Sequence, residues 1–224
     1  MRKKLPTRKK RAIWRCVAAA VLLVLIGVLI PRNFTLAAAH EQAMADLLAA
    51  PAETLYQTET PTGEWLVLAQ SEDTVCLGSY VQEDWLDWRC KRVRAVDREE
   101  HRPFAAGSEY WGGGYVDDGN PLGEKNTRYD YVFGCVWDPA VETIKIDFQG
   151  NDREEVTTEQ TVRLKTAEME TDSRGETWFF VALEPVENIW GWGCSITAYD
   201  SQGVPLGKQE LPGVAKWDDS VLAQ

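Results

Sequence analysis

The chain has 224 residues, with 24 Lys and Arg against 35 Asp and Glu, which gives a net charge of −11. The charge is unevenly distributed: residues 1–32 hold nine basic residues and no acidic one, so the other 192 residues carry a net charge of −20. Phosphate affinity comes from Lys and Arg, so this balance excludes the acidic part as a general nucleic-acid binder. At 44% apolar and 26% charged residues, the chain is neither disordered as a whole nor a polytopic membrane protein.

Residues 12–30 form an apolar run that only Arg15 interrupts. A helix of this length spans about 28 Å, close to the ~30 Å hydrocarbon core of a bilayer. The basic tail, residues 1–11, precedes the run, and the positive-inside rule places such a tail in the cytoplasm. The pattern predicts a transmembrane helix over residues 12–31, in contact with the lipid bilayer. The chain would then be a single-pass cell-membrane protein whose C-terminal domain lies outside.

The rival interpretation is a secretory signal peptide. The three alanines at 37–39 offer an A-x-A cleavage site, so the alternative is a protein secreted after cleavage near Ala39. The apolar run is longer than the usual signal-peptide core of about 7–15 residues. This length favours a retained anchor.

Residues 35–50 are predicted to form a helix. Thr35 is suited to the N-cap, and Pro51 ends the segment. His40 lies on the apolar stripe of this helix and is predicted to be a helix-surface residue. Residues 51–63 are rich in Pro, Gly, Thr and Glu and resemble a linker. Residues 32–63 are therefore predicted to form a helical stalk and linker. The stripe is spaced for one helix face and comprises Leu36, His40, Ala43, Met44, Leu47 and Leu48.

Residues 64–224 change to short apolar runs separated by turns, which is typical of strands at hairpin spacing. The pattern predicts a mainly β, Ig-like antiparallel β-sandwich. The run 88–96 has no clearly apolar face and fits an edge strand, whereas 178–183 is continuously apolar and fits a buried one. The predicted strands cover residues 65–70, 74–81, 88–96, 129–137, 141–148, 161–165, 178–183 and 194–199, with a short run near Val204.

Part of this domain resembles a known group of proteins. Residues 134–150 (GCVWDPAVETIKIDFQG) and the aromatic-Asp-x-x-Gly turn at 198–203 carry the resemblance. Similar stretches recur in small single-pass, membrane-anchored β-domain proteins on the outer surface of Gram-positive bacteria. The resemblance covers roughly residues 129–206 and implies an Ig-like β domain outside the membrane. It carries over no catalytic residues.

Four cysteines follow the predicted anchor, and an even number in an oxidising compartment is typical of disulfides. Four cysteines allow three connectivities. The most economical pairs Cys76 with Cys90 and Cys135 with Cys194, because the first pair lies on neighbouring predicted strands and the second on two central ones. The alternative is four buried free thiols, since Cys packs as a small hydrophobic residue. No C-x₂₋₄-C spacing supports a zinc site.

The aromatic residues of two glycine-rich segments are the candidate binding residues. The first segment lies within residues 99–128, a stretch with little strand signal, and the second is the run 190–193. Aromatic rings pack on the apolar faces of sugars and are enriched at binding hot spots. The alternative is that these aromatics simply fill the core. The candidates are Tyr110, Trp111, Tyr115, Trp190 and Trp192.

The sequence contains no motif that supports a catalytic or metal site, and it implies no cofactor. The chain has no G-x-S-x-G, S-x-x-K or H-E-x-x-H motif. The acidic run 117–120 departs from the EF-hand pattern.

The sequence therefore favours a membrane-anchored β domain that binds an envelope protein or a cell-wall glycan at the bacterial surface. One alternative is a structural or assembly subunit that acts through the stalk and membrane helix. The weakest alternative is a carboxylate-based envelope hydrolase.

Overall fold

The computed structural model describes residues 12–19, 21–22, 33–48, 51–84, 87–112, 127–152, 155–187 and 191–211. Residues 12–19 and 21–22 are helical, while the tail 1–11 and the rest of the predicted span 12–31 lie outside the described residues. Within the described ranges, no helix is long and apolar enough to cross a membrane.

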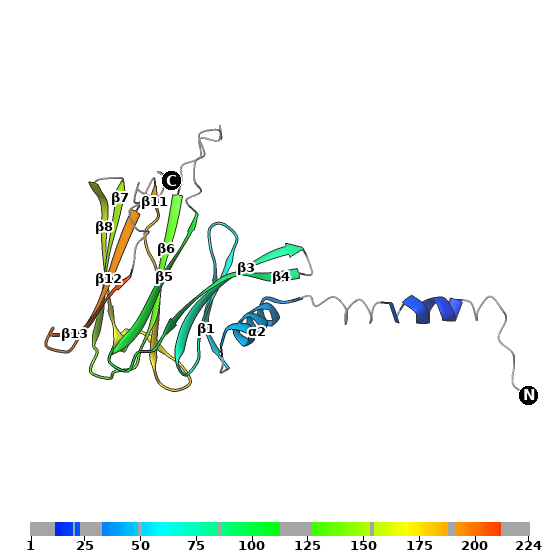
Figure 1. Cartoon of the computed structure of the whole chain (residues 1–224), viewed down its shortest axis with the longest axis horizontal. Helices are drawn as coiled ribbons and strands as arrows, with labels where there is room; N and C mark the ends of the chain where they lie inside the picture. The colour runs from blue at the N-terminus through cyan, green and yellow to red at the C-terminus, as the bar shows by residue number, and fades with distance from the viewer. Residues whose placement is uncertain are drawn as a thin grey trace, which may run out of the picture.

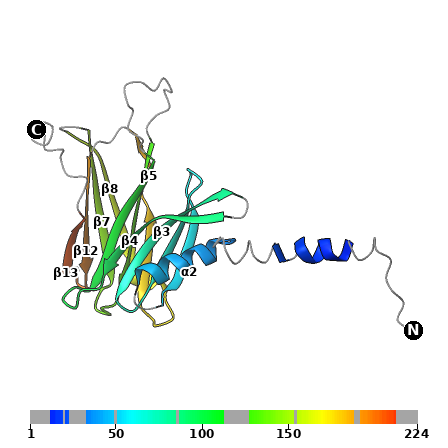
Figure 2. The same ribbon diagram turned by 45° about the vertical axis from the view of Figure 1, so that its right-hand side comes forward.

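The fold is mainly β, with three antiparallel sheets that stack as layers in Figures 1 and 2. Sheet A has the order β1-β2-β3-β4 and sheet C the order β13-β12-β7-β8. Sheet B has the order β11-β6-β10-β9, and β5 also pairs with β6. The strands of sheet A are β1 (Glu53–Glu59), β2 (Trp65–Gln70), β3 (Thr74–Asp84) and β4 (Asp87–Asp97). Those of sheet B are β5 (Phe104–Gly112), β6 (Thr127–Val136), β9 (Glu170–Thr171), β10 (Thr177–Ala182) and β11 (Val186–Glu187). Those of sheet C are β7 (Thr143–Asp152), β8 (Glu155–Lys165), β12 (Gly191–Tyr199) and β13 (Pro205–Leu211), and a 3₁₀ turn, η1 (Thr166–Glu168), follows β8.

Sheet B is the middle layer, and both of its faces are buried. Phe133 and Trp178 point toward sheet A and pack with Leu66 and Leu68. The alternate residues of the same strands point toward sheet C, where Phe179 and its neighbours pack with the sheet C side chains. A strand with two buried faces carries a continuous apolar run, which explains why β10 was predictable from its composition. The sheet C side of that core includes Ile144, Ile146, Phe148 and Ile196.

Helix α2 (Leu36–Leu47) covers the outer face of sheet A. Thr35 caps it as predicted, since its hydroxyl accepts a hydrogen bond from the Ala38 N–H at 3.1 Å. The predicted stripe packs on the domain itself: Met44 contacts the Cys76 side of the sheet, and His40 contacts Tyr80. The apolar stripe is therefore covered by sheet A and does not form a free stalk surface.

Two predictions about local structure are wrong. The proposed linker 51–63 contains β1, whose exposed, mostly polar sequence looks like a linker but pairs with β2. The proposed loop 99–128 contains β5, where the small residues Ala105, Ala106 and Gly107 remove the usual contrast between faces. β4 is an edge strand, as expected.

The free edge of β5 is protected by side chains from the other two sheets. From β13, the Gln209 amide donates to the Ala106 carbonyl at 2.8 Å and accepts from the Ala106 N–H at 3.2 Å. From β4, the Arg92 guanidinium donates to the Tyr110 carbonyl at 2.6 Å. Exposed strand edges invite pairing with other chains, so these bonds close the edge and join the three sheets.

Candidate functional site

The strands bring the described part of both aromatic segments to one end of the domain, which we call the loop end. Tyr110 and Trp111 lie near the end of β5, where it pairs with the start of β6; β11 pairs with that same part of β6. Trp192 is the second residue of β12, and β12 begins at this same end in both ribbon views. Tyr115 and Trp190 lie outside the described residues. Two segments far apart in sequence therefore reach the same end of the domain.

The Tyr110 ring lies between two guanidinium groups. The Cζ atom of Arg128 is 4.1 Å from the ring centroid, and that of Arg92 is 5.7 Å away. Arg92 also pairs with Glu109 at 3.2 Å. Cations over an aromatic face contribute about 0.5–2 kcal/mol each and hold the ring in one orientation.

A buried ion pair holds Arg128 in its position over the ring. Arg128 and Asp130 are two residues apart on β6, so they share a face of sheet B. They are 6% and 4% exposed, and the guanidinium contacts both carboxylate oxygens at 2.8–3.0 Å. Burial raises the pKa of Asp130, and the hydrogen bond and charge of Arg128 oppose this rise. Sequence reasoning missed the pair, although opposite charges two apart before an apolar strand were a usable signal.

This arrangement is suited to noncovalent binding. It presents the partly exposed Tyr110 ring with the side chains of Arg92 and Glu109 beside it, groups of the kind that stack on and hydrogen-bond to a polar ligand. The core thiol of Cys194 is not an activated nucleophile, because burial raises its pKa to about 12.

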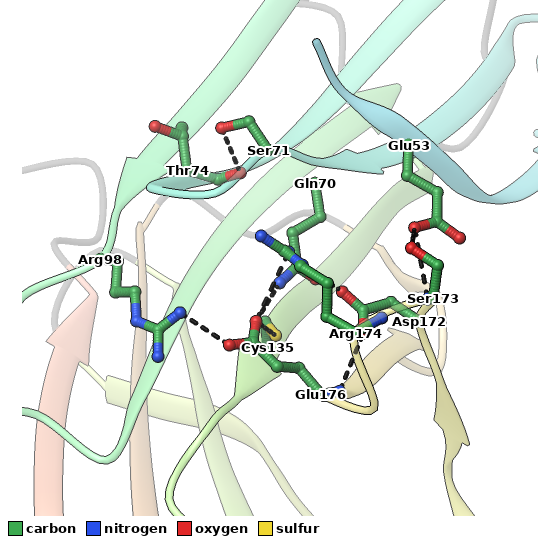
Figure 3. A network of polar contacts seen from close by, with 10 residues as sticks. All are labelled: Glu53, Gln70, Ser71, Thr74, Arg98, Cys135, Asp172, Ser173, Arg174 and Glu176. Carbon is green, nitrogen blue, oxygen red and sulfur yellow. Dashed lines mark hydrogen bonds and ion pairs between the residues drawn. The ribbon is translucent and has the colours of Figure 1, made fainter. Parts of the chain in front are cut away.

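A second polar cluster joins sheets A and B, as Figure 3 shows. Its centre is the Glu176 carboxylate, which accepts hydrogen bonds from Gln70 and Arg98 at 2.7 Å each. Asp172 organises the preceding turn: it accepts from the backbone N–H groups of Arg174 and Glu176 and from the Arg174 side chain, all at 2.8–2.9 Å. These bonds lower the pKa of Asp172 despite the opposing effect of its desolvation.

This second cluster has the properties of a structural crosslink. Its cations and carboxylates are paired with one another, and the Ser173 hydroxyl donates to Glu53 of β1. The Cys135 thiol beside it is not nucleophilic, since burial and then the Glu176 charge raise its pKa to about 12. We therefore assign the cluster to holding the 171–176 turn against sheet A.

The predicted disulfides are wrong, because all five cysteines are free thiols. In the β3–β4 ladder, Cys76 lies opposite Ala95, and Cys90 lies opposite Tyr80. Four residues of β3 separate these two positions along the ladder, roughly 13 Å between their backbones, which is beyond the Cα–Cα reach of a disulfide. Cys135 and Cys194 cannot form a disulfide for another reason: they belong to the cores on opposite faces of sheet B.

We expect Cys76, Cys135 and Cys194 to resist alkylation in the folded protein. All three are buried, and burial raises the pKa of each to about 12, so little reactive thiolate forms at neutral pH. Cys90 serves as the internal control for access, because it is exposed although burial raises the pKa of its thiol as well. Mass spectrometry after native alkylation, followed by the same reaction in denaturant, measures the difference. Oxidised Cys76 and Cys90 in material isolated without reductant would contradict the register described above.

His40 is a buried residue and not the helix-surface residue predicted from sequence. It is 5% exposed, and its Nδ1 lies 2.8 Å from the Tyr80 hydroxyl. Desolvation lowers the pKa of His40 below its ordinary 6.5, with Glu41 acting in the opposite direction. His101 is exposed. Groups of three or more His, Cys, Asp or Glu that could hold a metal do not occur among the described residues, and the run 117–120 lies outside them.

We expect the lowered pKa of His40 to make the fold less stable in mild acid. The unfolded chain binds a proton near pH 6.5 and the folded chain only at lower pH, so stability is full above about pH 6.5 and falls as the pH drops below it. Unfolding in urea at pH 5 and pH 7.5, for the wild type and His40→Gln, isolates this contribution from the other acids. The pH dependence should be shallower in His40→Gln. Equal slopes in the two proteins would contradict the assignment.

No protein-family model matches the chain, and no curated protein sequence matches it significantly.

Proposed function

We propose that this protein is a binding module of the bacterial cell surface, held at the membrane by residues 12–31 and exposing its β domain outside. Its partner is a cell-wall glycan or an envelope protein. The observation that carries the proposal is that β5 ends, and β12 begins, at the loop end, so that two separate aromatic segments reach the same end of the domain.

The geometry around Tyr110 favours a glycan over a purely apolar ligand. Arg92 and Arg128 fix the ring, while Glu109 supplies a carboxylate within the same cluster. Sugar recognition combines an aromatic platform with charged or amide groups that bind hydroxyls. An apolar protein ligand would leave these polar groups desolvated without partners, which is costly.

The anchor and the Ig-like character are parts of the same proposal. The basic tail before an apolar run of nineteen residues supports the anchor. Sheets B and C, between which the chain passes repeatedly from β6 to β12, support an Ig-like sandwich, with sheet A and α2 added to one face. The resemblance to anchored surface proteins of Gram-positive bacteria, over roughly residues 129–206, agrees with both.

The test is co-sedimentation of the full-length chain, in phosphatidylcholine nanodiscs, with cell-wall sacculi from a Gram-positive bacterium. A glycan ligand predicts binding that survives protease removal of the wall-attached proteins, whereas a protein partner predicts its loss. The double variant Tyr110→Ala, Trp192→Ala should weaken binding at least about thirtyfold, since the loss of even one hot-spot aromatic costs about 2 kcal/mol.

Tyr199→Ala is the matched control, because Tyr199 lies at the opposite end of β12 from Trp192. It should bind like the wild type, and so should Tyr110→Phe, which keeps the ring. Unchanged affinity in the double variant would remove the loop end from the proposal.

A further inference from the structure

The chain enters the domain at a point that is fixed to the β3–β4 hairpin. The backbone carbonyl of Asn33 accepts a hydrogen bond from the Trp88 N–H at 2.8 Å. The Asn33 side chain donates to Gln42 of α2 at 3.0 Å. Residue 33 is thus held by both sheet A and its covering helix and is not the start of a free tether.

This attachment limits how far the hairpin can lie from the membrane. The predicted span ends at residue 31, and two residues extend at most about 7 Å. The headgroup layer beyond the hydrocarbon is itself about 5–7 Å thick. If residues 12–31 span the bilayer, Asn33 and the Trp88 backbone bonded to it lie at the headgroup level.

The side chains at this point are aromatic. Phe34 is 52% exposed, and Trp88 meets Trp65 edge-to-face with ring centroids 6.4 Å apart. Tryptophan is enriched where a membrane protein meets the headgroups, because its ring is apolar and its N–H is polar. Trp65 and Trp88 are partly buried against the core between α2 and sheet A, so exposed Phe34 and the accessible edges of these two rings are the groups that fit a lipid interface.

Attraction of basic side chains to anionic lipid would not drive a contact between this surface and the membrane. Arg89 pairs with Glu83 at 2.8 Å and with Asp87 at 3.2 Å, and Lys91 pairs with Glu64 at 2.6 Å. Each cation beside the hairpin tip is therefore neutralised locally. A surface of this kind fits a zwitterionic headgroup layer and gains little from anionic lipid.

We propose that the face formed by Phe34, Trp65 and Trp88 rests on the phospholipid headgroups, so that the domain lies directly against the membrane. This inference rests on the proposed membrane anchor. The ends of β3 and β4 that form the hairpin project beyond the three-sheet body in both ribbon views (Figures 1 and 2). The domain then has a fixed orientation, with sheet A toward the bilayer and sheet C away from it.

The test places a fluorophore on Cys90, the exposed thiol two residues after Trp88, in a Cys16→Ser variant of the full-length chain. Phosphatidylcholine vesicles carrying nitroxide headgroups quench labels near the surface. The control label is on Gln202→Cys in a Cys16→Ser, Cys90→Ser background, because Gln202 lies in the exposed β12–β13 turn of sheet C. We expect quenching at Cys90 to be several-fold stronger than at position 202. Replacing a third of the lipid with phosphatidylglycerol should not increase it.

The outcomes separate this inference from the proposed function. Vesicle flotation is measured first, and a chain that does not float with the vesicles would overturn the anchor itself. A chain that floats while both labels are quenched equally weakly would overturn only the membrane-facing hairpin. Phe34→Ala, at an exposed position where folding should be unaffected, should float normally and show reduced quenching at Cys90.

Discussion

Replacing Asp130 with alanine is expected to lower the free energy of unfolding by about 3–5 kcal/mol, the cost of leaving a buried charge without its partner. Arg128 is 6% exposed, and both oxygens of the Asp130 carboxylate contact its guanidinium. Without that carboxylate, the cation stays desolvated at the sheet B–sheet C interface and no longer holds its place over Tyr110. Urea denaturation of the wild type and Asp130→Ala measures the loss.

The matched control is an exposed ion pair of similar length. Arg89 and Glu83 lie 2.8 Å apart, with side chains 60% and 48% exposed, so Glu83→Gln should change stability by only about 0–1 kcal/mol. An equal loss in the two variants would show that burial does not set the strength of the Asp130 pair.

A double replacement separates the value of the pair from the cost of breaking it. Burial raises the pKa of Asp130 even though Arg128 is bonded to it, so the ion pair does not fully offset its own desolvation. Arg128→Met, Asp130→Leu should therefore be more stable than Asp130→Ala. It should also lose the orientation of Tyr110, so a stable double variant with weakened wall binding would assign the pair to positioning the site.

Elements whose signal is local were predictable from the sequence. The bounds predicted for β2 match those observed, and the turns with Gly175 and Gly203 both have the positive φ that glycine favours. β10 was recognisable because a strand buried on both faces is apolar throughout. In each case a residue's own neighbours in sequence determine the structure.

Features that depend on which strands become neighbours were not predictable. β1 is polar and becomes a strand only by pairing with β2. Cys76 and Cys90 do lie on adjacent strands, but the register separates them. At the candidate site, the ring of Tyr110 was predicted, while Arg92 was not, because it comes from a different sheet.

Gly134→Ala is expected to destabilise the domain by about 1–3 kcal/mol, the range for adding a methyl group to a packed core. Gly134 lies in β6, opposite Ala106 on one side and Phe179 on the other. An added Cβ would lie 2.5 Å from the Phe179 Cζ and closer still to the Ala105 carbonyl oxygen. The Phe179 ring can shift, but the Ala105 carbonyl belongs to the backbone of the neighbouring strand and cannot move without disturbing the ladder.

Gly193→Ala on β12 is the control that separates the steric effect of an added methyl group from the effect of losing glycine's backbone freedom. A Cβ at Gly193 would meet no atom within 4 Å, so alanine there should be neutral or stabilise by up to about 0.5–1 kcal/mol, through the lost entropy of glycine. Thermal and urea unfolding of the two variants give the comparison. A loss confined to Gly134→Ala would establish that the middle sheet is packed tightly enough to exclude one methyl group. Equal losses would mean that alanine in these strands, and not the close approach of Ala105 and Phe179, is the cause.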